Sequence, residues 1–502
     1  MLSADILLVL PLLIPVFSAS IAVLFYKSNV AQRWTGVVGA IALCIAGILL
    51  FMEVRESGIL VTYLGNWPAP FGITLVADHL AATMLVLTGI LTLAVAVYSL
   101  GAVGEREEHF GYYPLTHVMV MGVCGSFLTG DLFNLFVWFE VMLIASFVLL
   151  VLGGRKIQLD GAFKYVLMNV VASTILLAGV SILYGITGSL NMADIAHRIH
   201  DIGEPGLVTV IAILFIIAFG MKAALFPLFF WLPASYHVPN IAVSAIFAGL
   251  LTKVGAYVMI RVFTLIFTED IAWTHEIILW LSVLTMFIGV LGAVSQFEWR
   301  KILSIHIISQ IGYMTLGLAL YTPMALAGAV LYVAHNIIIK ANLFLAAGIG
   351  HHLMGSYELK KLGGLYKYFP IFAAFNLLSA FSLAGVPPLW GFWAKFTVIF
   401  SAFQAERWIP AAFAIFVGLL TLYSMMKIWM YAFWKKHPEG DVPEHIQKKK
   451  VPLTMMIPVA ALTLMTIAIG LFAEPVIEIA MTAAEELLEP ERYIHAVLEA
   501  AP

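Results

Sequence analysis

The fold class that the sequence predicts is an all-α integral membrane protein with about fourteen transmembrane helices. Of the 502 residues, 62% are hydrophobic and 11% are charged, and the mean hydropathy is +1.00. Soluble domains carry about a quarter charged residues, so this composition excludes a soluble enzyme. The apolar runs are unbroken and about twenty residues long, enough to cross a bilayer core of about 30 Å as a helix. A membrane β-barrel would instead show alternating strands of about ten residues.

The individual spans follow from apolar runs separated by glycine, proline and charged residues. We expect them over residues 5–26, 34–53, 76–100, 115–130, 132–152, 163–187, 207–228, 241–267, 272–295, 302–320, 323–349, 370–400, 408–434 and 452–472. The first is expected to remain a helix and not to be cleaved as a signal peptide, because no lysine or arginine precedes it. Cys44 and Cys124 lie inside apolar runs and are interpreted as core residues without redox or metal function.

The distribution of lysine and arginine predicts the orientation in the membrane. Loops after odd-numbered spans hold Lys27, Arg33, Arg106, Arg155, Lys156, Lys164, Arg300, Lys301, Lys360, Lys361, Lys367, Lys435, Lys436, Lys448, Lys449 and Lys450. Loops after even-numbered spans hold only Arg55, Arg198, Arg407 and Arg492. Cytoplasmic loops retain positive charge, so we expect both termini outside. The acidic tail from Glu474 to Pro502 is expected to form a short surface helix, and the net charge of −3 gives no indication of a nucleic-acid partner.

A few charged side chains remain well inside the predicted spans. They are Glu140, Lys222, Lys253, Lys340 and Lys395. Each costs about 2.5–3.5 kcal/mol at the centre of a membrane helix, so their presence indicates function. Arg261 and Lys427 lie nearer to span ends, where we expect their side chains to reach the interface.

Two of these lysines lie where a helix is expected to break. Lys222 precedes a proline in Phe219-Gly-Met-Lys222-Ala-Ala-Leu-Phe-Pro227, and Lys395 follows two prolines in Val386-Pro387-Pro388-Leu-Trp-Gly-Phe-Trp-Ala-Lys395. Proline removes a backbone hydrogen bond and opens the helix. Interrupted spans at corresponding positions of two halves are typical of a transporter site built on internal repeats.

Buried amines and carboxylates of this kind can carry protons. Desolvation favours the neutral form of an amine, whereas a nearby carboxylate favours the charged form. A Glu140–Lys222 pair would therefore act as a switch that releases a proton to the next site when the pair opens. His335 and Lys340 are five residues apart and point about 140° from each other on a regular helix, so they form no single cluster unless a bulge realigns them.

The histidines allow two interpretations each. His306, Gln310 and Tyr313 form one polar stripe on a helix. His306 and His335 are either proton relays or core histidines with satisfied hydrogen bonds. His351 and His352 are interpreted as solvated surface residues. We find no zinc, haem, Walker or Rossmann spacing, so no cofactor and no nucleotide chemistry are expected.

The segments that carry these residues resemble the proton-translocating antiporter-like subunits shared by respiratory complex I and the Mrp antiporters. The resemblance is carried by the Lys222 segment through Pro233, by Trp299-Arg-Lys-Ile-Leu-Ser304 and by His335-Asn-Ile-Ile-Ile-Lys340. It extends over residues 60–430. The segments 65–78 and 132–140 are most similar to the Mrp branch of this family.

This resemblance implies an organisation and a set of roles. It implies two inverted five-helix repeats, over residues 111–268 and 269–435, each with one broken helix. A three-helix segment, residues 1–110, would precede them, and residues 436–502 would hold a cytoplasmic loop, the last span and the acidic tail. It implies Glu140 and Lys222 as a coupled ion pair, Lys253 as the link, and His335, Lys340 and Lys395 as onward relays. His306 and Asn336 differ from many relatives, which leaves the details of the path in the second half open.

The function that we expect is a proton-conducting subunit of a Na⁺/H⁺ antiporter. Such a chain would be a multi-pass plasma-membrane transporter subunit, not an enzyme, working without a cofactor and together with other Mrp subunits. An alternative is a proton-pumping subunit of complex I or of a related membrane hydrogenase. Lys395 and the lack of a C-terminal extension argue against some of the complex I subunits. A purely structural membrane anchor is disfavoured by the buried lysines.

Overall fold

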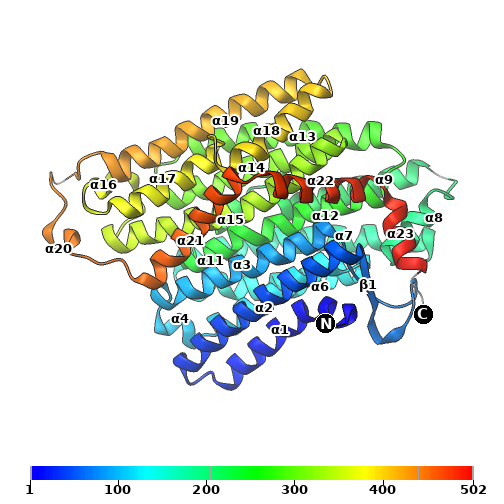
Figure 1. The fold of residues 1–502 in the computed structure, drawn as a ribbon, viewed down its shortest axis with the longest axis horizontal. Helices are drawn as coiled ribbons and strands as arrows, with labels where there is room; N and C mark the ends of the chain where they lie inside the picture. Colours follow the sequence, from blue (N-terminus) through cyan, green and yellow to red (C-terminus); the bar gives the residue numbers. More distant parts are fainter. Residues whose placement is uncertain (1–2, 204, 439, 500–502) are drawn as a thin grey trace.

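The chain folds into one bundle of helices that lie side by side (Figure 1). The computed structural model describes residues 3–203, 205–438 and 440–499. α1 to α3 form one edge of the bundle and α19 forms the opposite edge. α1 begins at the end of the bundle that carries β1 and α8. The last helix, α23, lies at the same end.

The elements of the first half are α1 Ala4–Leu24, α2 Asn29–Ser57, β1 Leu60–Tyr63, β2 Thr74–Ala77, α3 His79–Ala102, α4 Glu105–His109, α5 Tyr112–Leu128, α6 Leu132–Val151, α7 Lys156–Thr187, α8 Met192–Ile199, α9 Pro205–Ala223, α10 Trp231–Ser235, α11 Ile241–Ile246 and α12 Thr252–Leu265. A π-helical turn, Phe247–Leu251, joins α11 to α12. β1 and β2 pair antiparallel, with Leu60 opposite Ala77.

The elements of the second half are α13 Ile271–Ser295, α14 Trp299–Leu320, α15 Pro323–Met354, α16 Leu365–Tyr368, α17 Pro370–Ala384, α18 Trp390–Gln404, α19 Trp408–Trp429, α20 Glu444–Gln447, α21 Leu453–Leu471, α22 Glu474–Leu488 and α23 Pro490–Glu499. α19 ends in a second π-helical turn, Met430–Trp434. Short 3₁₀ turns cover Leu64–Asn66 and Leu359–Lys361.

The predicted all-helical membrane fold is confirmed. Twelve helices in the described part of the chain are long and apolar enough to cross a membrane. The two remaining predicted spans fall on α5, which has 17 residues, and on the pair α17 and α18. The predicted span 76–100 is wrong at its start, because residues 74–77 pair as strand β2 before the helix begins.

Side-chain caps explain where several spans begin. The carboxylate of Asp78 accepts a hydrogen bond from the Ala81 amide at the start of α3 (2.8 Å), and Asp131 does the same for Asn134 at the start of α6 (2.6 Å). Glu298 caps α14 through the Lys301 amide at 2.5 Å. Each cap satisfies a backbone donor that would otherwise lack a partner at the first turn.

Both expected helix breaks are present. α9 ends directly after Lys222, where Ala224 adopts a left-handed backbone with φ of +67°. α17 ends at Ala384, the next residue Gly385 has φ of +91°, and α18 begins after two prolines. The amide of Phe226 in the first break donates to Thr285 of α13 at 2.9 Å. Neighbouring helices therefore satisfy the backbone groups that the interruption frees.

The centre of the bundle is formed by α11–α12, α14 and α15, which are buried over nearly their whole length. These helices carry Lys253, His306, His335 and Lys340. The candidate residues are thus in the innermost layer and are kept away from lipid by the outer helices.

The acidic tail forms two helices instead of one short surface helix. α22 runs along α15 and α3 in the middle of the view in Figure 1, and Ala480, Ala483 and Ala484 are buried on its inner face. Glu486 accepts from the amide of His79 at 3.1 Å and contacts its ring at 2.7 Å. The expectation of one short surface helix is therefore wrong for this inner face, because small alanines allow close helix packing.

Arg261 does not reach the interface as expected. Its guanidinium forms an ion pair of 2.5 Å with Asp78, and both side chains are more than 90% buried. It also lies over the ring of Tyr493 from α23 at 5.3 Å. Arg261 therefore joins α12 to the start of α3 and to the tail.

This ion pair generates a stability prediction. Arg261→Met leaves the buried Asp78 carboxylate without its counter-charge, so we expect a loss of about 3–5 kcal/mol in the free energy of unfolding. Denaturant unfolding of the purified protein in micelles measures this loss. The double variant Asp78→Asn/Arg261→Met keeps the helix cap but buries no unpaired charge, and should recover a large part of the stability. A double variant as unstable as the sum of the two single variants would contradict this account.

Candidate functional site

The first group of candidate residues lies at the end of α9. The Lys222 amine donates to the Ser173 hydroxyl of α7 at 3.0 Å and lies 4.6 Å above the Phe139 ring. Glu140 is within electrostatic reach of this amine, but no ion pair within 4.0 Å joins the two in the described chain. One carboxylate oxygen of Glu140 is buried without a hydrogen-bond partner. The structure thus brings Glu140 and Lys222 near each other, in an open arrangement.

Lys253 is fully buried directly after the π-helical turn. Its amine donates to the Ala248 carbonyl of that turn at 2.6 Å. In a π-helical turn the backbone hydrogen bonds join residues five apart instead of four, so the carbonyls do not follow the α-helical pattern. Such turns are frequent at functional sites. The turn gives a charged amine an oxygen ligand inside an apolar bundle.

Glycines allow the helices around Lys253 to approach closely. A Cβ atom on Gly255 would lie 2.7 Å from the Ala223 amide nitrogen and 3.0 Å from the Lys222 carbonyl carbon. A Cβ atom on Gly249 would lie 3.1 Å from the Ile337 carbonyl oxygen of α15. α11–α12 therefore packs directly against the backbones that carry Lys222 on one side and Lys340 on the other.

Lys340 is the least satisfied of the candidates. It is fully buried in α15, and its amine has no hydrogen-bond partner among the described residues. Its electrostatic neighbours are Lys253 and Lys395. An amine without a partner and close to two further amines is a candidate for passing a proton on.

His335 lies on the same helix as Lys340 but faces another partner. Its Nε2 atom is 2.9 Å from the Ser382 hydroxyl, and its ring packs edge-on against Trp390. α15 is a regular helix over both positions, so the two side chains do not form one contact cluster. His335 Nδ1 has no partner within the described residues.

His306 and Lys395 complete the second half. His306 Nε2 contacts the Ser424 hydroxyl of α19, and its Nδ1 atom is buried without a partner in the part of the chain that the structure describes. The Lys395 amine donates to the Ala384 carbonyl at 2.9 Å, the last residue before the helix break. It lies 5.2 Å over the Tyr313 ring. Both residues are buried.

The second-half residues form one electrostatic group. His335 is influenced by Lys395, Lys340 and Lys253, and His306 by Lys340, Lys395 and Lys427. Lys427 itself bonds the carbonyls of Val294 and Gln296 at the end of α13, each at 2.6 Å. Lys427 thus lies near a span end as expected, but its side chain is buried against these carbonyls instead of reaching the interface.

The arrangement is suited to carrying protons through the bundle. No group of three or more His, Cys, Asp or Glu side chains that could hold a metal ion occurs within residues 3–203, 205–438 and 440–499. Sequence reasoning missed the hydroxyl partners Ser173, Ser382 and Ser424. Serine is common in helices, so only the packing of one helix on another reveals these contacts.

Comparisons with known proteins agree with this description. A family model described as "NADH:quinone oxidoreductase/Mrp antiporter, TM" matches residues 129–421. The chain is 48% identical over 495 residues to the D subunit of the Na⁺/H⁺ antiporter of Alkalihalophilus pseudofirmus, covering 98% of this chain and 99% of that protein. It is 42% identical over 492 residues to the protein of the same name from Bacillus subtilis, covering 98% and 99%.

A solved structure with the same fold is also known. A chain in the "Structure of Mrp complex from Dietzia sp. DQ12-45-1b" superposes with a TM-score of 0.91 at 33% identity, covering 99% of this chain and 100% of that one.

The contact at Gly255 yields a prediction. Gly255→Ala places a methyl group against the backbone of α9, so we expect overpacking to lower the free energy of unfolding by about 1–3 kcal/mol. Gly185→Ala is the matched control, because a Cβ atom on Gly185 meets nothing within 4 Å. This control should be neutral or stabilising by up to about 1 kcal/mol in its helix. Unfolding in micelles compares the two, and equal stability of both variants would contradict the close contact.

Proposed function

Because this chain belongs to the membrane-protein family shared by NADH:quinone oxidoreductase and the Mrp antiporters, we propose that it is the proton-translocating D subunit of a multisubunit Na⁺/H⁺ antiporter. The named relatives align over nearly the whole chain. Those relatives are antiporter subunits, so the chain is a transporter subunit and not an enzyme. The alternative, a proton-pumping subunit of complex I or a membrane hydrogenase, is not favoured by these relatives.

We propose that protons pass through Glu140, Lys222, Lys253, Lys340, His335, His306 and Lys395. The observation that carries this proposal is the set of buried, electrostatically coupled amines Lys253, Lys340 and Lys395. Protonating one of them disfavours charge on its neighbours, so arrival of a proton at one end favours release at the other. The helical segment that carries Lys253 packs between the helices of Lys222 and Lys340, so Lys253 would link the two halves.

Glu140 and Lys222 would switch this path. The structure holds Lys222 on Ser173, with one Glu140 oxygen unpartnered. A movement of the amine from the hydroxyl to the carboxylate would close an ion pair and hold the proton on Lys222. Reopening would release it toward Lys253. The membrane potential can drive such steps, since one charge moved across 100 mV corresponds to about 2.3 kcal/mol.

We propose that residues 111–268 and 269–435 are the two inverted repeats, with residues 1–110 before them and residues 436–502 after them. Two short backbone bridges support this division. Asp131 pairs with Asn191, and Glu298 pairs with Glu358, each over 60 residues. The first bridge joins the start of α6 to the segment that follows α7, and the second joins the start of α14 to the segment that follows α15. α7 and α15, the spans enclosed by these bridges, each have 32 residues.

The register of the repeats is a displacement of 167 residues, which carries Asp131 onto Glu298 and Asn191 onto Glu358. The same displacement carries the start of α7 at Lys156 onto the start of α15 at Pro323. Each proposed repeat crosses the membrane five times. Because five is odd, the second repeat begins on the opposite side of the membrane from the first and is therefore inverted. In this register Ser173, the partner of Lys222, corresponds to Lys340.

We propose that the partners are the other Mrp subunits, A, B, C, E, F and G, and that the transported cation is Na⁺. The protein is a multi-pass membrane protein, and we propose the plasma membrane as its location with both termini outside. The concentration of lysine and arginine in alternate loops supports this orientation.

The proposed switch predicts the effect of removing either member. Lys222→Ala and Glu140→Ala should each abolish Na⁺-dependent proton movement in everted membrane vesicles, while the other subunits still copurify with the chain. Lys164→Ala is the matched control, because this lysine is half-exposed and forms an ion pair with Asp160 one turn before it on the same helix. Wild-type transport by both switch variants would refute the proposed roles.

The proposed orientation predicts chemical labelling. In a Cys44→Ala/Cys124→Ala background, Glu491→Cys should react with an impermeant maleimide on intact cells, and Lys361→Cys only after permeabilisation. Both side chains are well exposed, at 75% and 68%. Labelling of Lys361→Cys alone on intact cells would reverse the assigned orientation.

A further inference from the structure

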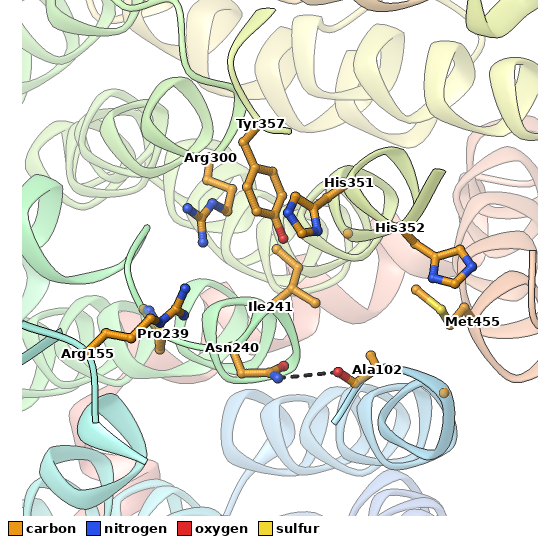
Figure 2. Close-up of a pocket in the computed structure, with 12 residues that line it drawn as sticks. Ala102, Arg155, Pro239, Asn240, Ile241, Arg300, His351, His352, Tyr357 and Met455 are labelled. Carbon is orange, nitrogen blue, oxygen red and sulfur yellow. Dashed lines mark hydrogen bonds between the residues drawn. The ribbon is translucent and has the colours of Figure 1, made fainter. Parts of the chain in front are cut away.

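A cavity of about 240 Å³ opens at the lysine- and arginine-rich end of the bundle, away from the relay. Its walls include Arg155, Asn240, Arg300, His351, His352 and Tyr357, drawn in Figure 2. His351 and His352 belong to the last turn of α15, and His351 is half-buried, so the expectation of two solvated histidines is wrong for His351. Gly348, also on the wall, is eight residues from Lys340, about 12 Å along the helix.

Arg300 is held rigidly on one wall. Its Nε donates to Glu298 at 3.0 Å, and its guanidinium lies 3.8 Å from the centre of the Tyr357 ring. His351 stacks on the same ring at 4.2 Å. Figure 2 shows Tyr357 between the Arg300 and His351 side chains. The Arg300 Nη groups have no hydrogen-bond acceptor in the described part of the protein.

Arg155 approaches the same space from the α6–α7 connection. Its Nη2 donates to the Val238 carbonyl at 3.3 Å, and no carboxylate lies within 4.0 Å among the described residues. Figure 2 shows its guanidinium turned toward that of Arg300. Both arginines act electrostatically on Tyr357 and His351.

The carboxylates near this cavity are already engaged. Glu298 bonds both Arg300 and the Lys301 amide, and Glu107 accepts from the Asn240 side chain at 2.6 Å. The cavity therefore presents two guanidinium groups with free donors and, among the described residues, no free carboxylate to face them. Arginine forks match the oxygens of a phosphate group, and basic pockets at the cytoplasmic ends of membrane helices bind anionic headgroups.

We propose that this cavity binds a phosphate-bearing anion between Arg155 and Arg300, either the headgroup of an anionic phospholipid or free phosphate. Arg155 comes from the first half of the chain and Arg300 from the second, so the bound anion ties the two halves together at this end. The Tyr357 hydroxyl provides an additional polar group on the wall (Figure 2).

Thermal unfolding of the delipidated, purified antiporter complex tests this site, with phosphatidylglycerol, inorganic phosphate and phosphate-free diacylglycerol as the three additives. We expect phosphatidylglycerol to raise the unfolding temperature of the wild-type complex. For Arg155→Gln and for Arg155→Gln/Arg300→Gln, its apparent affinity should be weaker by about tenfold or more, because charge-assisted hydrogen bonds are lost. Lys164→Gln/Lys361→Gln removes two positive charges from exposed lysines and should behave as wild type.

The additives distinguish the source of the anion. Protection by phosphatidylglycerol alone identifies a lipid headgroup, and equal protection by inorganic phosphate, with the same sensitivity to Arg155→Gln, identifies free phosphate as sufficient. Equal protection by diacylglycerol, or undiminished protection of both arginine variants, would overturn the site. Arg155 is exposed, so Arg155→Gln keeps the test valid if the loss of Arg300 prevents folding.

Discussion

A buried amine that carries charge is stabilised by oxygen ligands, and Lys253, Lys395 and Lys427 lie where the interrupted or ending backbone provides them. A regular helix uses its carbonyls internally, so free carbonyls occur only where a helix is interrupted or ends. Lys253 bonds the carbonyl of Ala248 in the π-helical turn, and Lys395 bonds that of Ala384 at a break. Lys427 uses the end of α13. These three lysines therefore depend on helix interruptions and helix ends for their oxygen ligands.

Much of this arrangement could be predicted from the sequence. Prolines beside Lys222 and Lys395 indicated both breaks, and the rarity of charge inside apolar runs selected the buried residues. The Asp78–Arg261 ion pair was missed, although both residues lie within predicted spans and have opposite sign. Their contact depends on how α3 packs against α12, and a one-dimensional pattern does not specify that packing. The π-helical turn beside Lys253 has no clear sequence signal for the same reason.

The buried amines of the two halves of the chain differ in their hydrogen-bond partners. In the first half, Ser173 offers a hydroxyl to Lys222, so the amine has a partner on the neighbouring helix. In the second half, the position that corresponds to Ser173 under the proposed repeat register is Lys340, a further amine with no partner in the described chain. A hydroxyl stabilises a proton on its neighbour, whereas a second amine competes for it. Lys222 therefore has an oxygen acceptor for its proton, and Lys340 has none among the described residues.

The most direct test of the account is the Na⁺-dependent proton movement of Lys340→Ala in everted vesicles, measured per assembled complex. The proposed proton path requires a loss comparable to that of Lys222→Ala, because Lys340 is the amine that is coupled electrostatically to both Lys253 and Lys395. A wild-type rate with Lys340→Ala would show that protons do not pass through Lys340, and would contradict the proposed path.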